Sequence, residues 1–330
     1  MLTTNRLPIK SKNFPILYTP HSRATSMKPP LWKITLVLAI AVLAISTAAI
    51  LSRLAFDAGG TRAVGFSLML VASRITLASL ILLPTWRKLK LSQQSPEAIR
   101  YSIAAGVLLA LHFAGWINSL AYTSIAAATT LVTTNPVWIS LFSWIWFREK
   151  ISWTSAGGIA IALAGGLLIG FGDATGGDPG SNPLLGDVLA LMAAWVASLY
   201  LLFAREAQRK GISLGGYMAI AYTTAALVLL PIPPLFSGSY AGHPSLVYLY
   251  ILLMAIVPQS IGHTGFNWAV LWMSPTLVSL SILFEPVGAS FLGYLVFGEI
   301  PPIQVFAGAV VLLAGVAVVA IGHNPDTKSG

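Results

Sequence analysis

The sequence predicts an all-α integral membrane protein whose ten transmembrane helices form two inverted repeats of five helices. Three observations lead to this fold class: a succession of long apolar stretches, an internal repeat and an uneven distribution of positive charge. Of the 330 residues, 56% are hydrophobic and only 9% are charged. Soluble domains carry roughly 25% charged residues, so lipid rather than water is expected to surround most of this chain.

A helix needs about 20 mostly apolar residues to cross a bilayer, and ten stretches come close to that length or exceed it. They cover residues 34–51, 64–83, 101–121, 126–147, 153–171, 186–205, 214–235, 246–270, 276–297 and 303–321. The chain therefore divides into a tail (1–30), a first repeat (31–172), a second repeat (183–322) and a tail (323–330). The connections are too short for a soluble catalytic domain. The absence of cysteine excludes disulfides, thiolate metal sites and cysteine nucleophiles.

Lysine and arginine collect on one side of the predicted membrane. With the N-terminus inside, the N-terminal tail and the second, fourth and sixth connections hold nearly all of them, whereas the opposite connections have only Arg53 and Arg62. Positive residues favour the cytoplasmic side, so both termini are predicted to be cytoplasmic, in a bacterial-type inner membrane. The net charge of +9 has the same cause and requires no nucleic-acid partner.

The N-terminal tail is basic and contains no acidic residue. Transit peptides have this composition, and a transit peptide would place the protein in a plastid envelope. A disordered tail is the second interpretation, and translation that starts at Met27 is the third.

The second half of the chain repeats the first at a shift of 150 residues. The register aligns Gly115 with Gly265, Pro136 with Pro286, and Glu149 with Glu299. Each repeat has five spans, an odd number, so the second copy enters the membrane in the opposite orientation. Inverted repeats are typical of secondary transporters, which bind substrate near the midplane between the halves. The alternative is an old duplication that is retained for packing alone.

Several motifs in this register resemble a known family. Residues 112–124 read HFAGWINSLAYTS, residues 133–138 read TTNPVW and residues 147–149 read FRE, while the second half has LFEPV at 283–287 and FGE at 297–299. These strings resemble the EamA family of the drug/metabolite transporter superfamily, and the resemblance extends over nearly the whole chain after residue 30. It implies a ten-helix carrier of two inverted repeats that moves small metabolites, often outward.

Polar side chains within two spans follow one helix face. In the eighth span they are Gln259, Ser260, His263, Thr264 and Asn267. At 100° per residue these five occupy an arc of about 140°, which suits the lining of a solute path. The alternative is hydrogen bonding between helices, worth only about 0.6 kcal/mol per bond.

The third span, the repeat mate of the eighth, has a comparable face. Its members are His112, Trp116, Ser119, Tyr122 and Thr123. A face of this composition suits an organic solute with apolar and hydrogen-bonding parts. Aromatic residues also gather at membrane interfaces, which is the alternative for Tyr122, and His112 is equally compatible with a packing role.

Prolines are predicted to kink the fourth and ninth spans, because Pro136 and Pro286 each remove a backbone hydrogen bond. The preceding residues are Asn135 and Glu285, and Thr133 belongs to a polar stripe of the fourth span. Carbonyl groups freed by a kink can bind a ligand or can be satisfied by neighbouring groups.

Two charges lie well inside predicted spans. Glu285 would cost about 2.5–3.5 kcal/mol on insertion scales as a charged group, and it is expected either to couple transport to protons or to be a neutral acid that bonds a loosened carbonyl. Arg74 is expected either to hold a substrate carboxylate or to lock a helix by pairing with carbonyl groups or Glu285. Glu149 and Glu299 are expected to cap the N-terminus of the next helix.

Together these patterns predict a secondary transporter, not an enzyme, that exports a small amino-acid-like or drug-like metabolite by alternating access. The sequence has no Walker lysine loop, and no cofactor or metal is expected. The expected partners are a small-molecule substrate, membrane lipid and a coupling proton, in a monomer or homodimer. Two alternatives stay open. An integral membrane enzyme acting on a lipid or prenyl substrate would need clustered acids, and an organophosphate or nucleotide-sugar exchanger would need several intramembrane Lys or Arg residues.

Overall fold

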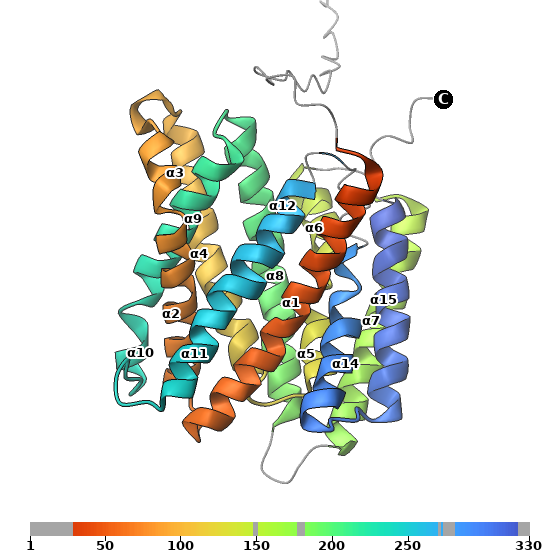
Figure 1. Ribbon diagram of the computed structural model, residues 1–330. Coiled ribbons are helices and arrows are strands. Elements are labelled where there is room, and N and C mark those ends of the chain that lie inside the picture. Colours follow the sequence, from red (N-terminus) through yellow and green to blue (C-terminus); the bar gives the residue numbers. More distant parts are fainter. Residues whose placement is uncertain (1–28, 148–150, 177–181, 270–271, 273–280, 323–330) are drawn as a thin grey trace, which may run out of the picture.

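The computed structural model describes residues 29–147, 151–176, 182–269, 272 and 281–322, and it is a bundle of helices (Figure 1). Eight helical segments in this part of the chain are long and apolar enough to cross a membrane, and a ninth, Trp153–Ile169, is apolar but shorter. The predicted all-α class is therefore confirmed, whereas the number of ten spans stays a prediction. The first helix of the chain begins, and the last one ends, at the same end of the bundle (Figure 1).

The described residues of the first half form seven α-helices and one short 3₁₀ turn, η1. They are α1 (Leu31–Gly59), α2 (Val64–Ile81), α3 (Leu83–Lys88), η1 (Leu91–Gln93), α4 (Pro96–Ser119), α5 (Ile125–Val132), α6 (Asn135–Phe147) and α7 (Trp153–Gly176). The side chains of Ser95 and Ser124 accept the backbone N–H groups of Ala98 and Ala127, which fixes the starts of α4 and α5. At the end of α1, Gly60 adopts a φ of 62°, the left-handed conformation that favours glycine.

The second half continues in the same way. Its elements are α8 (Pro183–Arg209), α9 (Leu214–Leu229), α10 (Ile232–Leu235), α11 (Ser245–Met254), η2 (Ala255–Gly262), α12 (His263–Ala269), α14 (Glu285–Phe297) and α15 (Ile303–Gly322). The segment η2 is a π-helix with Pro258 in its interior. The eighth predicted span is therefore irregular in its middle. π-Helical turns are rare and frequently occur at functional sites.

The fourth and ninth predicted spans each contain a break. The chain leaves the helix at Thr133 and Thr134 and re-enters it at Asn135, and it does the same at Leu283 and Phe284 before Glu285. Pro136 and Pro286 are therefore the second residues of α6 and α14, where a missing backbone N–H costs nothing. Residues 273–280 of the ninth span lie outside the described part.

Helices α7 and α15 pack against each other in antiparallel fashion through glycines. A Cβ atom at Gly158 would lie 2.7 Å from the backbone nitrogen of Val319, and one at Gly165 would lie 2.7 Å from the carbonyl oxygen of Gly308. In the 150-residue register, Gly158 corresponds to Gly308 and Gly165 to Gly315, and Gly158 also faces Gly315. The contact thus repeats itself when the two halves are exchanged, as two inverted copies require.

Two further helix pairs correspond in the same register. Helix α4 packs along α8, and the eighth predicted span, made of α11, η2 and α12, packs along α1. Gly115 of α4 approaches Ala193 of α8, while Gly265 of α12 approaches Ala41 of α1. The third span therefore packs along the first helix of the second half, and the eighth span packs along the first helix of the first half.

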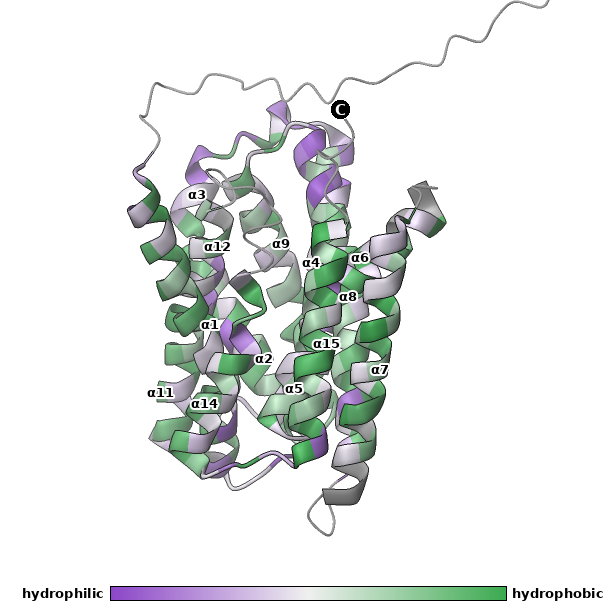
Figure 2. Cartoon of the chain, turned by 90° about the vertical axis from the view of Figure 1, so that its right-hand side faces the viewer, coloured by the Kyte–Doolittle hydropathy of each residue, from purple (hydrophilic) through white to green (hydrophobic). Residues whose placement is uncertain are grey.

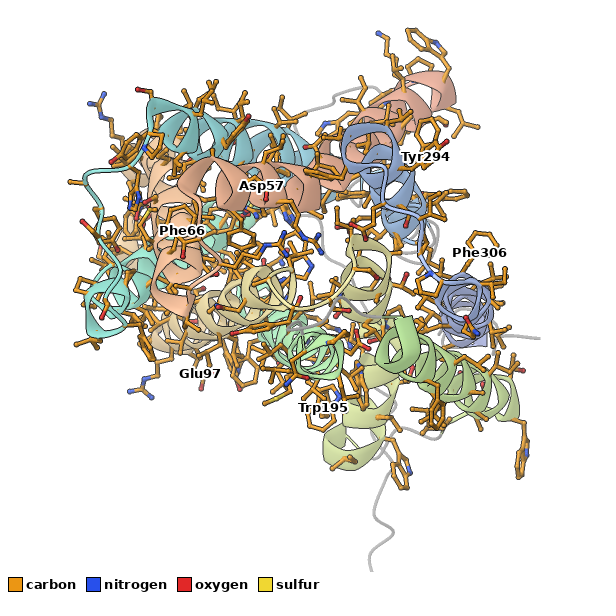
Figure 3. All side chains as sticks on the ribbon, turned by 90° about the horizontal axis from the view of Figure 1, so that it is seen from below. Asp57, Phe66, Glu97, Trp195, Tyr294 and Phe306 are labelled. Atoms are coloured by element: carbon orange, nitrogen blue, oxygen red, sulfur yellow. The ribbon has the colours of Figure 1, made fainter. Side chains whose placement is uncertain are left out.

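The outer surface of the bundle is apolar. Figure 2 shows hydrophobic residues along most of the helix surfaces, with hydrophilic residues gathered toward the ends. Seen from one end, the labelled side chains Trp195, Tyr294 and Phe306 lie at the periphery (Figure 3), and between 43% and 58% of each is exposed. Exposed aromatic and aliphatic side chains over such an area suit contact with lipid rather than water.

Candidate functional site

Arg74 is the largest fully buried side chain with a charge, and it lies in the middle of α2 with 1% of its surface exposed. A charged group at this depth is expensive unless it is paired or has a function. Its environment is built from three other segments, α4, α9 and η2, which belong to both halves of the chain.

Gln259 of the π-helical segment η2 holds one edge of the Arg74 guanidinium. Its Oε1 accepts hydrogen bonds from Nε of Arg74 at 3.1 Å and from Nη2 at 2.7 Å. The amide nitrogen of Gln259 donates to the hydroxyl of Tyr222 on α9 at 2.6 Å. This chain of hydrogen bonds joins the first half of the protein to the second across a fully buried interface.

Two aromatic rings of α4 flank the same guanidinium. Cζ of Arg74 lies 4.5 Å from the centre of the Phe113 ring and 5.9 Å from that of the Trp116 ring. Both distances permit cation–π attraction, which is strongest in a desolvated site. The ring of His263 meets Phe113 edge to face at 6.1 Å, so α12 completes the aromatic wall.

Two hydrogen-bond donors of this cluster have no partner. Nη1 of Arg74 and Nε1 of Trp116 are buried, and neither meets an acceptor among the described residues. The Glu285 carboxyl group on α14 is close enough to interact electrostatically with Arg74, but the two do not form an ion pair. The Arg74 charge is therefore oriented by an amide and is not neutralised by a described carboxylate.

The broken helices meet neighbours at their prolines. The carbonyl oxygen of Asn135 accepts a hydrogen bond from Ser198 of α8 at 3.3 Å, and that of Glu285 accepts one from Ser46 of α1 at 3.3 Å. These two carbonyl groups are thus satisfied by serines of neighbouring helices. The side-chain oxygen of Asn135 is buried without a partner.

Three other residues of the predicted path contact backbone carbonyl groups. His112 contacts the carbonyl oxygen of Ala193 through Nδ1 at 2.9 Å, and Ser119 donates to the carbonyl oxygen of Trp116 at 2.6 Å. Thr133 donates to a carbonyl group within its own segment, that of Thr130, at 2.9 Å.

The structure does not preserve the whole polar arc of the eighth span. Thr264 is exposed on the surface of the bundle, whereas Gln259 is buried. The arc was derived for a regular α-helix, and the π-helical segment turns less per residue, so the residues after it are rotated. The side chain of Asn267 lies outside the described part.

A second charged cluster lies where α4 ends and α5 begins. Arg53 of α1 forms an ion pair with Glu299 at 3.4 Å and donates to the carbonyl oxygen of Thr123. The other carboxylate oxygen of Glu299 accepts the backbone N–H of Ile125 at 2.7 Å, and Thr123 donates to Asp187 of α8 at 2.8 Å. We refer to these five residues as the Arg53 cluster.

The Arg53 cluster corrects one expectation. Glu299 caps a helix, but that helix is α5 of the other half and not the following helix, α15. The cause is the packing of α14 against α5, which brings the end of α14 to the start of α5. Glu149 lies outside the described residues.

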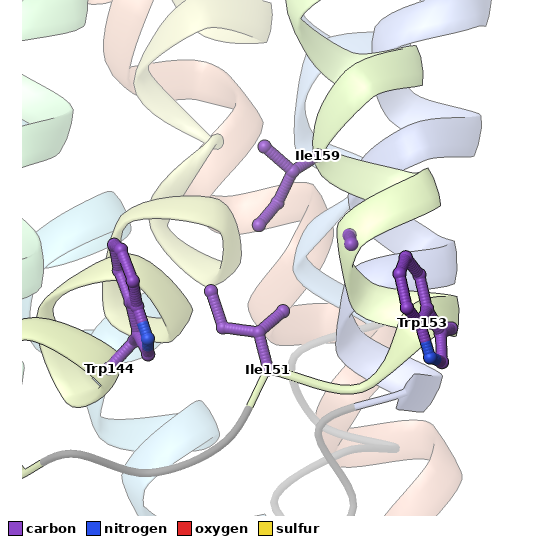
Figure 4. Close-up of a pocket in the computed structure, with 5 residues that line it drawn as sticks. Trp144, Ile151, Trp153 and Ile159 are labelled. Carbon is purple, nitrogen blue, oxygen red and sulfur yellow. The ribbon is translucent and has the colours of Figure 1, made fainter.

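The hollow drawn in Figure 4 is a poor candidate for a substrate site. Its volume is about 520 Å³. It lies between α6 and α7, where it is lined by Trp144, Ile151, Trp153, Ala156 and Ile159. Trp153 is 94% exposed. The lining side chains carry no charge, and exposed tryptophans of this kind are typical of a membrane interface.

Sequence reasoning did not single out several residues of these clusters, among them Phe113, Tyr222 and Arg53. Phe113 was not singled out because an apolar residue in a span gives no signal. Tyr222 stands in the seventh span among apolar residues, and its hydroxyl could have drawn attention there. Arg53 was counted only as a loop charge, although it lies within α1 and pairs with Glu299.

Comparison with known proteins now identifies relatives. A model of the EamA-like transporter family matches residues 32–171 and 184–321, so the two matches correspond to the two halves. This confirms the resemblance drawn from the motifs.

Two bacterial transporters illustrate the relationship. The "Uncharacterized transporter YdfC" of Bacillus subtilis is 29% identical over 209 residues, which cover 62% of this chain and 65% of the relative. A "Probable terminal-alkyne amino-acid exporter" of Streptantibioticus cattleyicolor is 25% identical over 194 residues, covering 58% and 63%. The matched part thus spans just under two thirds of these relatives.

One solved structure shares the fold. It superposes with a TM-score of 0.58 over 88% of this chain and 98% of its own, at 19% identity.

Proposed function

The chain belongs to the EamA-like transporter family, and on that premise we propose that it is a secondary transporter of a small organic metabolite. The single observation that supports this most directly is the Arg74–Gln259–Tyr222 connection. It is a buried, charged contact between the two halves of the chain, in the interior of the bundle. Secondary transporters with inverted repeats bind their substrates at such an interface, near the membrane midplane.

The transport cycle would be alternating access of ten helices in two inverted five-helix repeats. The mirrored glycine contact between α7 and α15 supports the inversion. The substrate path would run between the third, fourth, eighth and ninth predicted spans, past Arg74, Trp116 and Glu285. The Arg53 cluster would close one end of that path, because it ties α1 and α14 to α5 and α8.

Glu285 is the group that would couple transport to protons. It is 6% exposed and lies directly before a proline in the broken ninth span. It is also close enough to Arg74 to be attracted by its charge. An acid that binds a proton on one side of the membrane and releases it on the other can couple a proton gradient to solute movement. His112 and His263 lie at the same aromatic cluster and would assist.

The direction would be outward and the cargo amino-acid-like or drug-like. The name of the Streptantibioticus cattleyicolor relative, an amino-acid exporter, supports both points. The test is a comparison of metabolites in cells and medium with and without overexpression of the full chain. Enrichment of a small metabolite in the medium is the expected result, and unchanged profiles in both compartments would contradict the proposal.

The path is tested by Trp116→Ala and Asn267→Ala. Both should reduce transport of the identified metabolite while the protein remains in the membrane at wild-type amounts. Normal transport by both variants would show that the substrate path does not pass these two residues.

The orientation has a separate test. The chain has no cysteine, so a single introduced thiol reports its own accessibility. We expect Asp178→Cys to react with an impermeant reagent from outside and Arg209→Cys only from inside. The reverse pattern would contradict the cytoplasmic placement of both termini.

A further inference from the structure

The unsatisfied N–H donors of Arg74 and Trp116 indicate the chemical class of the cargo, if the proposed transport function holds. We propose that the substrate carries a carboxylate that binds between Nη1 of Arg74 and Nε1 of Trp116, with its apolar body against the Phe113 ring. The cargo class would then be organic monocarboxylates, including amino acids in their zwitterionic form.

The two unpaired donors are costly. Buried N–H groups nearly always have an acceptor, and each exception requires an explanation. Here two exceptions occur on Arg74 and Trp116, which both lie against the Phe113 ring, and both side chains are less than 5% exposed. A ligand that supplies two acceptor oxygens would satisfy both donors at once.

Arg74 is held by an amide on one edge only. Gln259 occupies the edge formed by Nε and Nη2, and Gln259 is itself fixed by Tyr222. The guanidinium is therefore oriented without being neutralised, and its Nη1 remains directed away from Gln259. An amide partner suits a site that must release its ligand, because a protein carboxylate would compete with the substrate for the same charge.

The number of charges also favours a monocarboxylate. Arg74 is the only buried arginine or lysine among the described residues and has no ion pair, whereas the half-buried Arg53 has Glu299 as its partner. One positive charge balances one carboxylate, whereas a phosphate monoester would bring a second negative charge into the interior without compensation. The aromatic wall of Phe113, Trp116 and His263 provides apolar surface for the remainder of the molecule.

The experiment measures binding to the purified full chain in detergent by thermal stabilisation, which follows ligand affinity and concentration. The probes are matched series in which aliphatic, branched and aromatic bodies each carry a carboxylate, a primary amide or an amine, such as 3-phenylpropanoate, 3-phenylpropanamide and 3-phenylpropylamine. We expect at least one carboxylate to stabilise the wild-type protein and its amide and amine counterparts to have little effect.

Two variants connect that preference to the proposed donors. Trp116→Phe removes the indole N–H and keeps an aromatic ring, so it should weaken carboxylate binding roughly 10-fold or more, as expected for the loss of a hydrogen bond to a charged group. Arg74→Lys keeps the charge but loses the planar fork, and it should weaken binding further. Trp195→Phe, on the exposed surface of α8, is the matched control and should bind like the wild type.

The outcomes separate this inference from the proposed function. Equal stabilisation by a carboxylate and its amide, unchanged carboxylate affinity in Trp116→Phe, or no stabilisation by any carboxylate would each overturn the inference. Export of a neutral or cationic metabolite in the cell experiment would also overturn it, while the transporter function would stand. Carboxylate binding without export of any metabolite would instead contradict the transporter function.

Discussion

Two arginines among the described residues, the half-buried Arg53 and the buried Arg74, are held in opposite ways. Arg53, 12% exposed in its side chain, has the Glu299 carboxylate opposite it and a carbonyl group beside it, in a cluster that ties α1, α5, α8 and α14 together. Arg74, 1% exposed, has an amide, aromatic faces and one unpaired nitrogen. Both connect the first half of the chain to the second.

The partner of each arginine determines what its charge can do. A guanidinium that already has a carboxylate partner contributes to closure and stability, because its charge is compensated within the protein. A guanidinium that is oriented but not compensated retains attraction for an incoming anion, at a cost in folding free energy. The amide of Gln259 and the carboxylate of Glu299 differ by one atom and one charge, so each arginine can be converted into the other type.

The largest effect is expected from Gln259→Glu, which would give Arg74 the kind of partner that Arg53 has. The new carboxylate can accept from Arg74 and from the Tyr222 hydroxyl, so the fold should be as stable as the wild type or more stable. Transport should fall roughly 100-fold or more, since loss of a buried charged contact costs about 2–5 kcal/mol. Transport in proteoliposomes and the Tm are the measurements.

The matched control for this change is Gln304→Glu, which places the same new charge on an exposed position of α15. It should leave transport near the wild-type rate. Wild-type transport by Gln259→Glu would show that the uncompensated charge of Arg74 is not needed.

The second effect concerns Glu285, the carboxyl group that faces Arg74 without pairing with it. Glu285→Gln keeps the shape but cannot release a proton, so accumulation against a concentration gradient should be lost. Counterflow exchange should continue, because it needs no net proton movement. If the variant still accumulates substrate under an imposed proton gradient, Glu285 has a structural role and another residue couples transport to protons.

A smaller effect is expected from Glu299→Gln, which makes Arg53 resemble Arg74. The amide oxygen can still accept the N–H of Ile125, so α5 keeps its cap while the ion pair is lost. A partly exposed pair of this kind contributes about 1 kcal/mol. A double-mutant cycle with Arg53→Gln, read in thermal unfolding, should recover that coupling, and transport should fall only several-fold. A coupling free energy of zero between Arg53 and Glu299 would show that their ion pair does not close the path.

The smallest effect is expected at the exposed ion pair between Lys210 and Glu97, which joins the end of α8 to the start of α4. Both side chains are more than 40% exposed, so water and salt screen their attraction. Lys210→Met should change neither the Tm nor the transport rate measurably. A marked loss of transport here would mean that charge pairs at the surface, and not only Arg53 and Arg74, control the cycle.

The membrane environment of the helices and the internal repeat could be predicted from the sequence. Apolar stretches of about 20 residues can be satisfied only as helices in lipid, and the 150-residue register located Pro136 and Pro286 beside the helix breaks. The isolated charges Arg74 and Glu285 were identifiable because a charge inside a span is rare. These inferences depend on composition and spacing along one chain, which need no knowledge of the neighbours.

Which side chains meet depends on the tertiary structure. Gln259 contacts Arg74 from the π-helical segment η2, and the change of helical pitch there rotates the residues that follow, among which Thr264 is exposed. Phe113 contacts the guanidinium, and Glu299 caps α5 rather than α15, because segments far apart in sequence pack together. Periodicity predicts the face of one regular helix, whereas a site between inverted halves depends on the rotation and crossing of several helices, which no single-helix pattern contains.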